Sequence, residues 1–335
     1  MRAAATVAAG ALACLALGLA FPWTKTPLVT ALCYGLAALG VAVLMRAGQV
    51  SFGHAMYAAI SAYTVVFLAR RFPQADALAL IAAGVTASLA AGALIGLFVV
   101  RYREIFFGML NLALSMVLYS LLGKFYTVTG GTDGLRMERP TLAGVALERA
   151  GYETALLALT LALAVALGAA VQRFYRSAAG EALAGVKTNE TRLEYLGLSA
   201  QRVLWSGYVI SVVLVGLAGA LMALLQGLVT PESGYWLRSG EYVFVAILGG
   251  AAHAAGAFAG ALAFEVIKLF AAAYLTGVWQ LLLGAVLIAV ILVAPAGISG
   301  AFAKARRAGA PAPVAPAGDE AGLAPPLLER MSRER

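Results

Sequence analysis

The sequence contains very little charge. Only 12% of its 335 residues are Asp, Glu, Lys or Arg, whereas 62% are hydrophobic. A soluble domain has about twice that charged fraction, so this composition excludes an ordinary soluble protein and indicates an all-α, polytopic membrane protein. The formal net charge of +8 is typical of cytoplasmic anchoring and contact with anionic lipid, and it does not imply a nucleic-acid partner.

Residues that bind metals or perform catalysis are also scarce. Cys14 and Cys33 both lie in apolar runs, and we interpret them as packing residues. His54 and His253 are far apart and have no acidic cluster beside them, so we expect neither a metal site nor an intramembrane enzyme. The glycine-rich segment 129–134 is not followed by Lys-Ser/Thr, and the chain has no Walker motif. We therefore expect no catalytic residue, no cofactor and no ATP hydrolysis by this chain.

One charged stretch, residues 173–202, interrupts the apolar sequence. Each charge at the centre of a membrane helix costs roughly 2.5–3.5 kcal/mol, so this stretch is predicted to be a water-exposed connection between two membrane halves. Leu193, Leu196 and Leu198 alternate with its charges, and Gly197 can end a short helix in the left-handed conformation. The stretch is either a docking surface for a soluble partner or an ordinary solvated loop.

The apolar runs around this stretch predict about ten transmembrane helices. They cover residues 3–21, 28–45, 55–68, 77–100, 105–122, 154–171, 203–225, 242–252, 254–274 and 278–294. The first is either a retained span or a cleaved signal peptide, and the eighth is too short to cross a bilayer by itself. The Ala/Pro-rich end of the chain is predicted to be disordered, which gives a membrane domain of 1–303 and a tail of 304–335.

Basic residues and glycine pairs predict how these helices are arranged. Ten crossings from a cytoplasmic N-terminus place more Lys and Arg on the cytoplasmic side, so both termini are predicted to be cytoplasmic. Gly92 and Gly96 form one small-xxx-small motif, and Gly256 and Gly260 form another. The two motifs occupy equivalent places if the second to fifth spans repeat, inverted, as the seventh to tenth.

Polar residues also occur between and within the predicted spans. Segment 46–55 is either a tight polar turn at the membrane surface or a break in the backbone close to a substrate pathway. Asn111 and Ser115 share one helix face, where they either line a pathway or bond to a neighbouring helix. The pathway hypothesis groups five residues: Gln49, Ser51, His54, Asn111 and Ser115.

Several motifs occur in a characteristic order. They are GQVSFGHAMYAAISAY (48–63), TGGTDGL (129–135), LEYLGLSAQRVLWSGYVIS (193–211), GLAGALMAL (216–224), ILGGAAHAAGAFAGA (247–261) and PAGISG (295–300). This ordered set resembles the LivM-type inner-membrane permeases of branched-chain amino-acid ABC importers, and the resemblance extends over nearly the whole chain up to Gly300.

The resemblance implies a fold similar to that of the large-permease importers, with alternating access around a central pathway. It implies a second, related permease, two ATP-binding cassette subunits that bind and hydrolyse ATP, and a periplasmic substrate-binding protein. The expected substrates are branched-chain or other hydrophobic amino acids, with urea and short amides as the alternative. An ion-coupled secondary transporter is a further alternative, for which Glu265 and Lys268 are the ionisable candidates.

Two groups of contact residues follow from the same resemblance. The coupling helix seated in the ATPase corresponds to residues 187–198 and contains Lys187, Asn189, Glu190, Leu193, Leu196 and Gly197. The two longest outer loops, 129–139 and 231–238, are predicted to receive the binding protein through Asp133, Arg136, Arg139 and Arg238.

Overall fold

The computed structural model describes residues 2–274, 279–293, 297, 298 and 300. The longer helices are α1 (Arg2–Ala20), α2 (Lys25–Arg46), α3 (Ala55–Arg71), α4 (Ala77–Val99), α5 (Glu104–Lys124), α7 (Arg149–Tyr175), α10 (Ala200–Gln226), α11 (Trp236–Gly249), α12 (Ala254–Tyr274) and α13 (Trp279–Val293). Three shorter helices lie in the connections: α6 (Tyr126–Thr129), α8 (Ala178–Thr188) and α9 (Glu190–Tyr195). The tail predicted at 304–335 lies outside the described residues.

Every apolar run predicted to span the membrane contains a helix in the described part of the chain. Six helices are long and apolar enough to cross a membrane: Pro22–Arg46, Ala77–Val99, Glu104–Lys124, Arg149–Tyr175, Ala200–Gln226 and Ala254–Ala271. The all-helical membrane architecture is therefore confirmed, while the count of about ten spans stays a prediction. The helices α3 and α11 have 17 and 14 residues and do not by themselves reach the length of a typical span.

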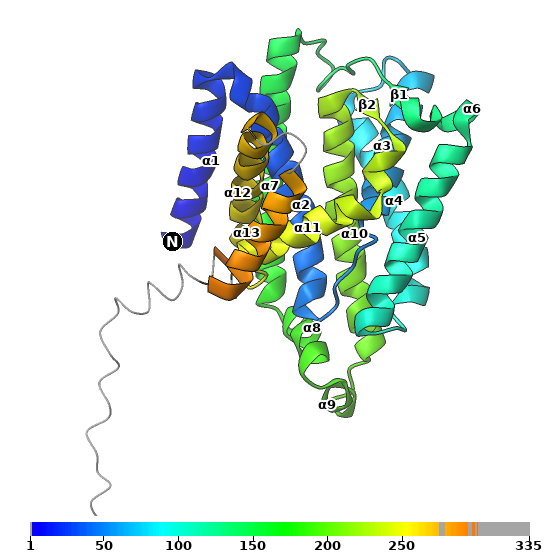
Figure 1. The fold of residues 1–335 in the computed structure, drawn as a ribbon, viewed down its shortest axis with the longest axis vertical. Helices are drawn as coiled ribbons and strands as arrows, with labels where there is room; N and C mark the ends of the chain where they lie inside the picture. The colour runs from blue at the N-terminus through cyan, green and yellow to red at the C-terminus, as the bar shows by residue number, and fades with distance from the viewer. Residues whose placement is uncertain (1, 275–278, 294–296, 299, 301–335) are drawn as a thin grey trace, which may run out of the picture. The chain divides into compact units, whose positions relative to one another are not determined.

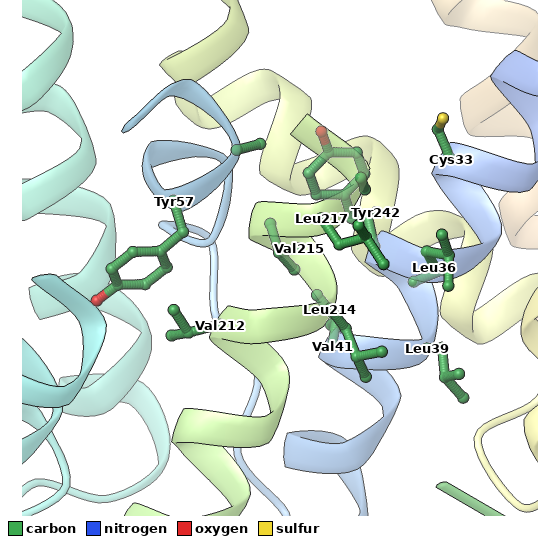
Figure 2. Packing of buried hydrophobic residues seen from close by; sticks show 14 of the residues in the cluster. Cys33, Leu36, Leu39, Val41, Tyr57, Val212, Leu214, Val215, Leu217 and Tyr242 are labelled. Carbon is green, nitrogen blue, oxygen red and sulfur yellow. The ribbon is translucent and has the colours of Figure 1, made fainter. Parts of the chain in front are cut away.

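The core of the bundle is the contact between α2 and α10, and α10 also packs against α3 and α4. Figure 2 shows Val41 of α2 beside Leu214 of α10. Gly40 lets the two backbones approach, because a Cβ at this position would lie 2.8 Å from the Ser211 carbonyl oxygen. Within lipid, where apolar side chains gain little by leaving the solvent, close packing of this kind stabilises the contact between helices.

The two glycine motifs make close contacts with different partners. A Cβ at Gly92 would lie 2.4 Å from the Val212 side chain, so the motif on α4 packs against α10 as its spacing predicts. The motif on α12 instead faces α11, since a Cβ at Gly260 would lie 2.5 Å from the Val245 carbonyl oxygen. Gly92 lies late in α4, whereas Gly256 lies in the first turn of α12. The inverted repeat, in which the two motifs would occupy equivalent places, stays a prediction.

The bundle has two distinct ends (Figure 1). At one, here called the connector end, α8 and α9 join α7 to α10. At the other, the strand end, β1 (Leu135–Arg136) pairs antiparallel with β2 (Leu228–Val229). This pairing brings together the two loops that the sequence predicts on the same side of the membrane.

Two segments outside the α-helices enter the bundle from opposite ends and stop near the middle of α5; the second contains β2 and a 3-10 helix, Pro231–Gly234. The first re-entrant segment, 47–54, precedes α3, and a Cβ at its Gly53 would lie 2.0 Å from the Asn111 carbonyl oxygen. The second re-entrant segment, 227–235, precedes α11, and the carbonyl oxygen of its Gly234 accepts a 2.7 Å hydrogen bond from Ser115. Residues 51–54 are mostly buried, so the interpretation of segment 46–55 as a surface turn is wrong.

The helices that follow the two re-entrant segments, α3 and α11, are here called the half-helices, and they begin side by side. The backbone N–H of Ala55, the first residue of α3, donates a 2.8 Å hydrogen bond to the hydroxyl of Ser239 in the first turn of α11. α11 then runs obliquely across the middle of the bundle (Figure 1) and packs against α12 and α2. The span predicted to begin at residue 242 therefore begins earlier than expected, at Trp236, and the outer loop before it is correspondingly shorter.

Candidate functional site

The first re-entrant segment is held by a buried, uncharged hydrogen-bond network. His54 Nδ1 and the Ser51 hydroxyl lie 2.6 Å apart, and the hydroxyls of Tyr57 and Tyr208 lie 2.7 Å apart. Tyr208 donates to Asn111 Oδ1 at 2.7 Å, so the network joins α3, α10 and α5. All five side chains are buried. The Ser51 hydroxyl also accepts a 3.3 Å hydrogen bond from the backbone N–H of Gly53. Backbone polar groups at membrane depth require such partners within the protein, so this bond helps a broken helix to be tolerated here.

The remaining pathway candidates have comparable partners. Gln49 Oε1 accepts a 2.8 Å hydrogen bond from the backbone N–H of Glu104, and Ser115 bonds to Gly234 as described above. The prediction that Asn111 and Ser115 bond to neighbouring elements is confirmed. A role of these residues in lining the pathway stays a prediction. Among the five candidates, His54 has a buried ring nitrogen, Nε2, without a hydrogen-bond partner among the described residues.

The connector end carries two short helices with well-defined ends. Asn189 separates α8 from α9, and its Oδ1 caps α9 by accepting a 2.9 Å hydrogen bond from the Arg192 backbone N–H. Gly197 has a φ of +80°, and its N–H bonds to the Glu194 carbonyl while that of Leu198 bonds to the Leu193 carbonyl. These two bonds define a Schellman motif, so the prediction that glycine ends this helix is confirmed.

The apolar residues of α9 divide into two sets. Tyr195 and Leu196 are 88% and 71% exposed, and Leu198 is 44% exposed. Leu193 is instead buried at 7% and lies against Gly185 of α8. Of the leucines among the predicted ATPase-coupling residues, Leu193 therefore packs inside the connector, and Leu196 lies on its exposed surface. The exposed group, which we call the connector knob, consists of Tyr195, Leu196 and Leu198.

Ion pairs fasten the connector end to the membrane helices. Arg46 at the end of α2 pairs with Glu181 on α8 at 3.0 Å. Arg103, just before α5, pairs with Glu190 on α9 at 2.5 Å. The neighbouring Glu104 is the residue whose backbone N–H bonds to Gln49. A continuous chain of contacts therefore runs from α9 to the first re-entrant segment.

At the strand end, three predicted docking residues are accessible. Asp133, Arg136 and Arg139 are all exposed. The Tyr126 hydroxyl donates a 2.9 Å hydrogen bond to the Asp133 carboxylate, and this bond together with the negative charge raises the pKa of Tyr126. The loop that carries Asp133 is further fixed by the β1–β2 pairing.

Arg238, the fourth predicted docking residue, does not lie in an outer loop. It lies in the first turn of α11, where Nη1 donates to the Tyr34 hydroxyl and to Glu241 Oε2, the latter at 3.1 Å. Glu241 also lies 3.9 Å from Lys268 on α12. We call Tyr34, Arg238, Glu241 and Lys268 the charged cluster. From the sequence, only Lys268 in this cluster is recognisable as a charge within the membrane.

A cavity of about 70 Å³ adjoins this charged cluster. Its walls are small residues of α3 and α10, residues of the second re-entrant segment, and Arg238 and Tyr242 of α11. The sequence gives no sign of this cavity, because its walls come from parts of the chain that are far apart. The bundle thus combines two re-entrant segments, a cavity beside the charged cluster and an exposed connector knob.

Comparison with known proteins identifies the family. Residues 24–291 match the family model described as branched-chain amino acid transport system / permease component, so the chain belongs to this family. It is 29% identical over 244 residues to the high-affinity branched-chain amino acid transport system permease protein LivM of Escherichia coli (strain K12), covering 65% of this chain and 56% of that protein. The LivM protein of Salmonella typhimurium (strain LT2) matches with the same identity and coverage. The chain thus aligns with little more than half of the length of these relatives, and no solved structure matches it.

Proposed function

We propose that this chain is the membrane-spanning permease subunit of an ATP-driven importer of branched-chain or other hydrophobic amino acids. The observation that carries the proposal is the connector knob. It is an exposed apolar group on a capped helix, fastened by ion pairs to the membrane bundle of a chain that belongs to this permease family. Exposed Tyr and Leu side chains surrounded by charge are typical of a protein interface.

The assembly that we propose contains a second, related permease, two ATP-binding cassette subunits and a periplasmic substrate-binding protein in a bacterial inner membrane. The connector end and both termini face the cytoplasm, and the strand end faces the periplasm. We further propose about ten spans and an inverted repeat. The repeat is supported by the contacts of α2 with α11 and α12, which parallel those of α10 with α3 and α4.

In this proposal, movement of the ATPase subunits is transmitted through α9. The Arg103–Glu190 pair and the Glu104–Gln49 hydrogen bond connect α9 to the first re-entrant segment, which precedes α3. A displacement of the connector therefore reaches the middle of the bundle through direct contacts. Helix bundles that rock between two openings require such a link between the driving subunit and the pathway.

Leu196→Asp tests this coupling. A carboxylate buried and unpaired at the ATPase interface is expected to cost several kcal/mol, so the ATPase subunits should no longer co-purify and leucine uptake should fall. Thr191→Asp is the control, because it adds the same charge to the connector outside the knob and should leave co-purification unchanged. Leu12→Asp is unsuitable as a control, because it would place a charge on the apolar helix α1. Intact co-purification and uptake in Leu196→Asp would mean that the connector is only a solvated link.

The strand-end loop is proposed to receive the binding protein. Exposed charges at the rim of an interface mainly set the encounter rate and its salt dependence. The double variant Arg136→Glu/Arg139→Glu should therefore slow uptake at low ionic strength, with a smaller effect at high salt. Equal uptake by this variant and the wild-type importer at low ionic strength would remove the strand-end loop from the docking surface.

The charged cluster is the observation that favours a second candidate, an ion-coupled carrier, because charged residues within a membrane commonly mark ion or proton pathways. Uptake into proteoliposomes that contain the permease with or without its ATPase subunits separates the two candidates. An importer requires the ATPase subunits and ATP, whereas a secondary carrier requires an ion gradient. Competition by urea and short amides in the same assay tests the alternative substrates.

A further inference from the structure

The cavity beside α11 combines a wall of small residues with one cationic side chain. Ala58 and Ala62 of α3 face Gly219 and Ala223 of α10 across it. A Cβ at Gly219 would lie 2.2 Å from the Ala58 carbonyl oxygen, so the two helices touch at one edge of the cavity. Above this contact the alanines leave open space, and such a wall suits an aliphatic side chain.

The polar side of the cavity is formed by Thr230 and Ser233 of the second re-entrant segment, by Arg238, and by Gln226 at the end of α10. The described hydrogen bonds of the Arg238 guanidinium all use Nη1, which faces Tyr34 and Glu241. Its Nε and Nη2 make no hydrogen bond to the residues that the structure describes, and the side chain is 32% exposed although it lies within the bundle. The guanidinium therefore has one edge fixed by the protein and one edge available beside the cavity.

The charges around Arg238 favour an anionic group at this available edge. Glu241 forms ion pairs with both Arg238 and Lys268, so these three residues together hold two positive charges and one negative charge. Glu265 on α12 supplies a further carboxylate, but no ion pair joins it to Arg238 in the described structure. Arg238 also lies in the first turn of α11, where the aligned peptide dipoles favour an anion. A guanidinium edge binds a carboxylate through two parallel hydrogen bonds.

We infer that this cavity is a substrate subsite, in which Arg238 binds the α-carboxylate of an amino acid and the alanine wall accepts its aliphatic side chain. The inference rests on the proposed function and adds the residues that recognise the substrate during its passage. Thr230 and Ser233 supply hydroxyls beside the carboxylate. Urea and amides have no carboxylate, so the subsite also selects amino acids over these alternative substrates.

The test uses the complete importer in proteoliposomes, with leucine-loaded binding protein outside and ATP inside. Arg238→Gln should lower leucine uptake about tenfold or more, the loss expected for a charge-assisted hydrogen-bond pair, while ATP hydrolysis stimulated by the binding protein continues. Arg238→Lys keeps the positive charge but lacks the two parallel N–H donors of the guanidinium, so it should give intermediate uptake. Arg71→Gln, which removes an exposed arginine at the end of α3, should leave uptake unchanged.

Two further variants separate recognition from a structural role of Arg238. Tyr34→Phe removes a hydrogen bond on the fixed edge of the guanidinium and leaves the available edge intact, so uptake should be largely retained. Ala62→Leu fills the cavity without changing the charged cluster and should lower uptake, whereas Ala62→Ser should not. Co-purification of the ATPase subunits and the thermal unfolding midpoint confirm that each variant is assembled.

The outcomes distinguish the two proposals. Normal leucine uptake by assembled Arg238→Gln would overturn the subsite and leave the importer function standing. Equal losses in Tyr34→Phe and Arg238→Gln, together with normal uptake by Ala62→Leu, would also overturn it, because Arg238 would then act only by fixing α11. A wild-type importer that takes up no amino acid would refute the proposed function, and the subsite with it, before any variant is compared.

Discussion

The two half-helices of this permease are positioned in similar ways but stabilised by different chemistry. Both α3 and α11 follow a re-entrant segment, and both begin near the middle of α5. The first turn of α3 and its preceding segment are fixed by uncharged groups, among them His54 and Ser51. The first turns of α11 are instead fixed by Arg238 and Glu241, with Lys268 of α12 close by.

This difference has consequences for function. An uncharged network in which most polar groups bond to one another holds a backbone in one place and offers few groups to a passing substrate. A charged cluster costs more to bury, and residues of this kind within membranes usually take part in the transport step. We therefore expect the uncharged network to position the backbone and the charged cluster to take part in recognition, and three pairs of variants test this expectation.

The largest effect is expected from adding a methyl group to the first re-entrant segment. In Gly53→Ala the new Cβ would lie 2.0 Å from the Asn111 carbonyl oxygen, a backbone atom that cannot turn aside. Overpacking of this severity costs about 3 kcal/mol or more, so the permease should accumulate poorly and unfold at a lower temperature in detergent. The equivalent change in the other half, Gly234→Ala, places a Cβ 3.0 Å from the Ala59 Cβ, and a smaller loss is expected.

Accumulation in the membrane and the unfolding midpoint of the purified permease measure both variants. Wild-type behaviour of Gly53→Ala would show that the first re-entrant segment can move away from α5, and the positioning role expected of the uncharged network would then be lost. A larger loss in Gly234→Ala than in Gly53→Ala would reverse the expectation for the two halves.

The sequence predicts one of these halves much better than the other. Two glycines and several polar residues in 46–55 mark a break between apolar runs, and the hypothesis of broken backbone at membrane depth describes what the structure contains. Residues 231–238 carry Pro231, Glu232 and Arg238, which by composition indicate an outer loop. The charge of Arg238 is accommodated by Tyr34, far away in the sequence, and by Glu241, whose second partner Lys268 belongs to another helix. Local composition cannot report such long-range pairing, and for the same reason the cavity is not visible in the sequence.

In the connector, too, the sequence predicts some features and not others. Helix termination at Gly197 is predictable because only a few residues tolerate a positive φ. The sequence does not predict which leucine faces outward, because Leu193 and Leu196 have the same side chain and differ only in their contacts with α8. The family resemblance is confirmed, whereas the docking roles assigned to individual residues stay predictions.

A smaller effect is expected from removing one charge of the cluster. Glu241→Gln keeps a hydrogen-bond acceptor for Tyr34 but leaves Arg238 and Lys268 without the carboxylate that lies between them. Loss of one partner of a buried ion pair costs about 3–5 kcal/mol, and partial exposure of Arg238 and Lys268 reduces this to about 1–3 kcal/mol. The unfolding midpoint should fall accordingly, and leucine uptake should fall with it.

Glu265→Gln is the matched control on α12. It removes a carboxylate that has no described ion pair, so a smaller change in the unfolding midpoint is expected than for Glu241→Gln. If both variants lower the midpoint equally, the cluster acts through its total charge, and the specific bridging position of Glu241 is unimportant.

Effects of similar or smaller size are expected within the neutral network, where Tyr208 makes more hydrogen bonds than Tyr57. Tyr208 bonds to both Tyr57 and Asn111 Oδ1, so Tyr208→Phe leaves two buried groups without this partner and should cost about 1–3 kcal/mol. Tyr57→Phe removes one hydroxyl, while the Tyr208–Asn111 bond remains, and should cost less. Thermal unfolding of the two variants and of the double variant measures the difference. If Tyr57→Phe lowers the unfolding midpoint as much as Tyr208→Phe, the bond to Asn111 contributes little, and α5 is held against the half-helices by the Gly53 and Gly234 contacts instead.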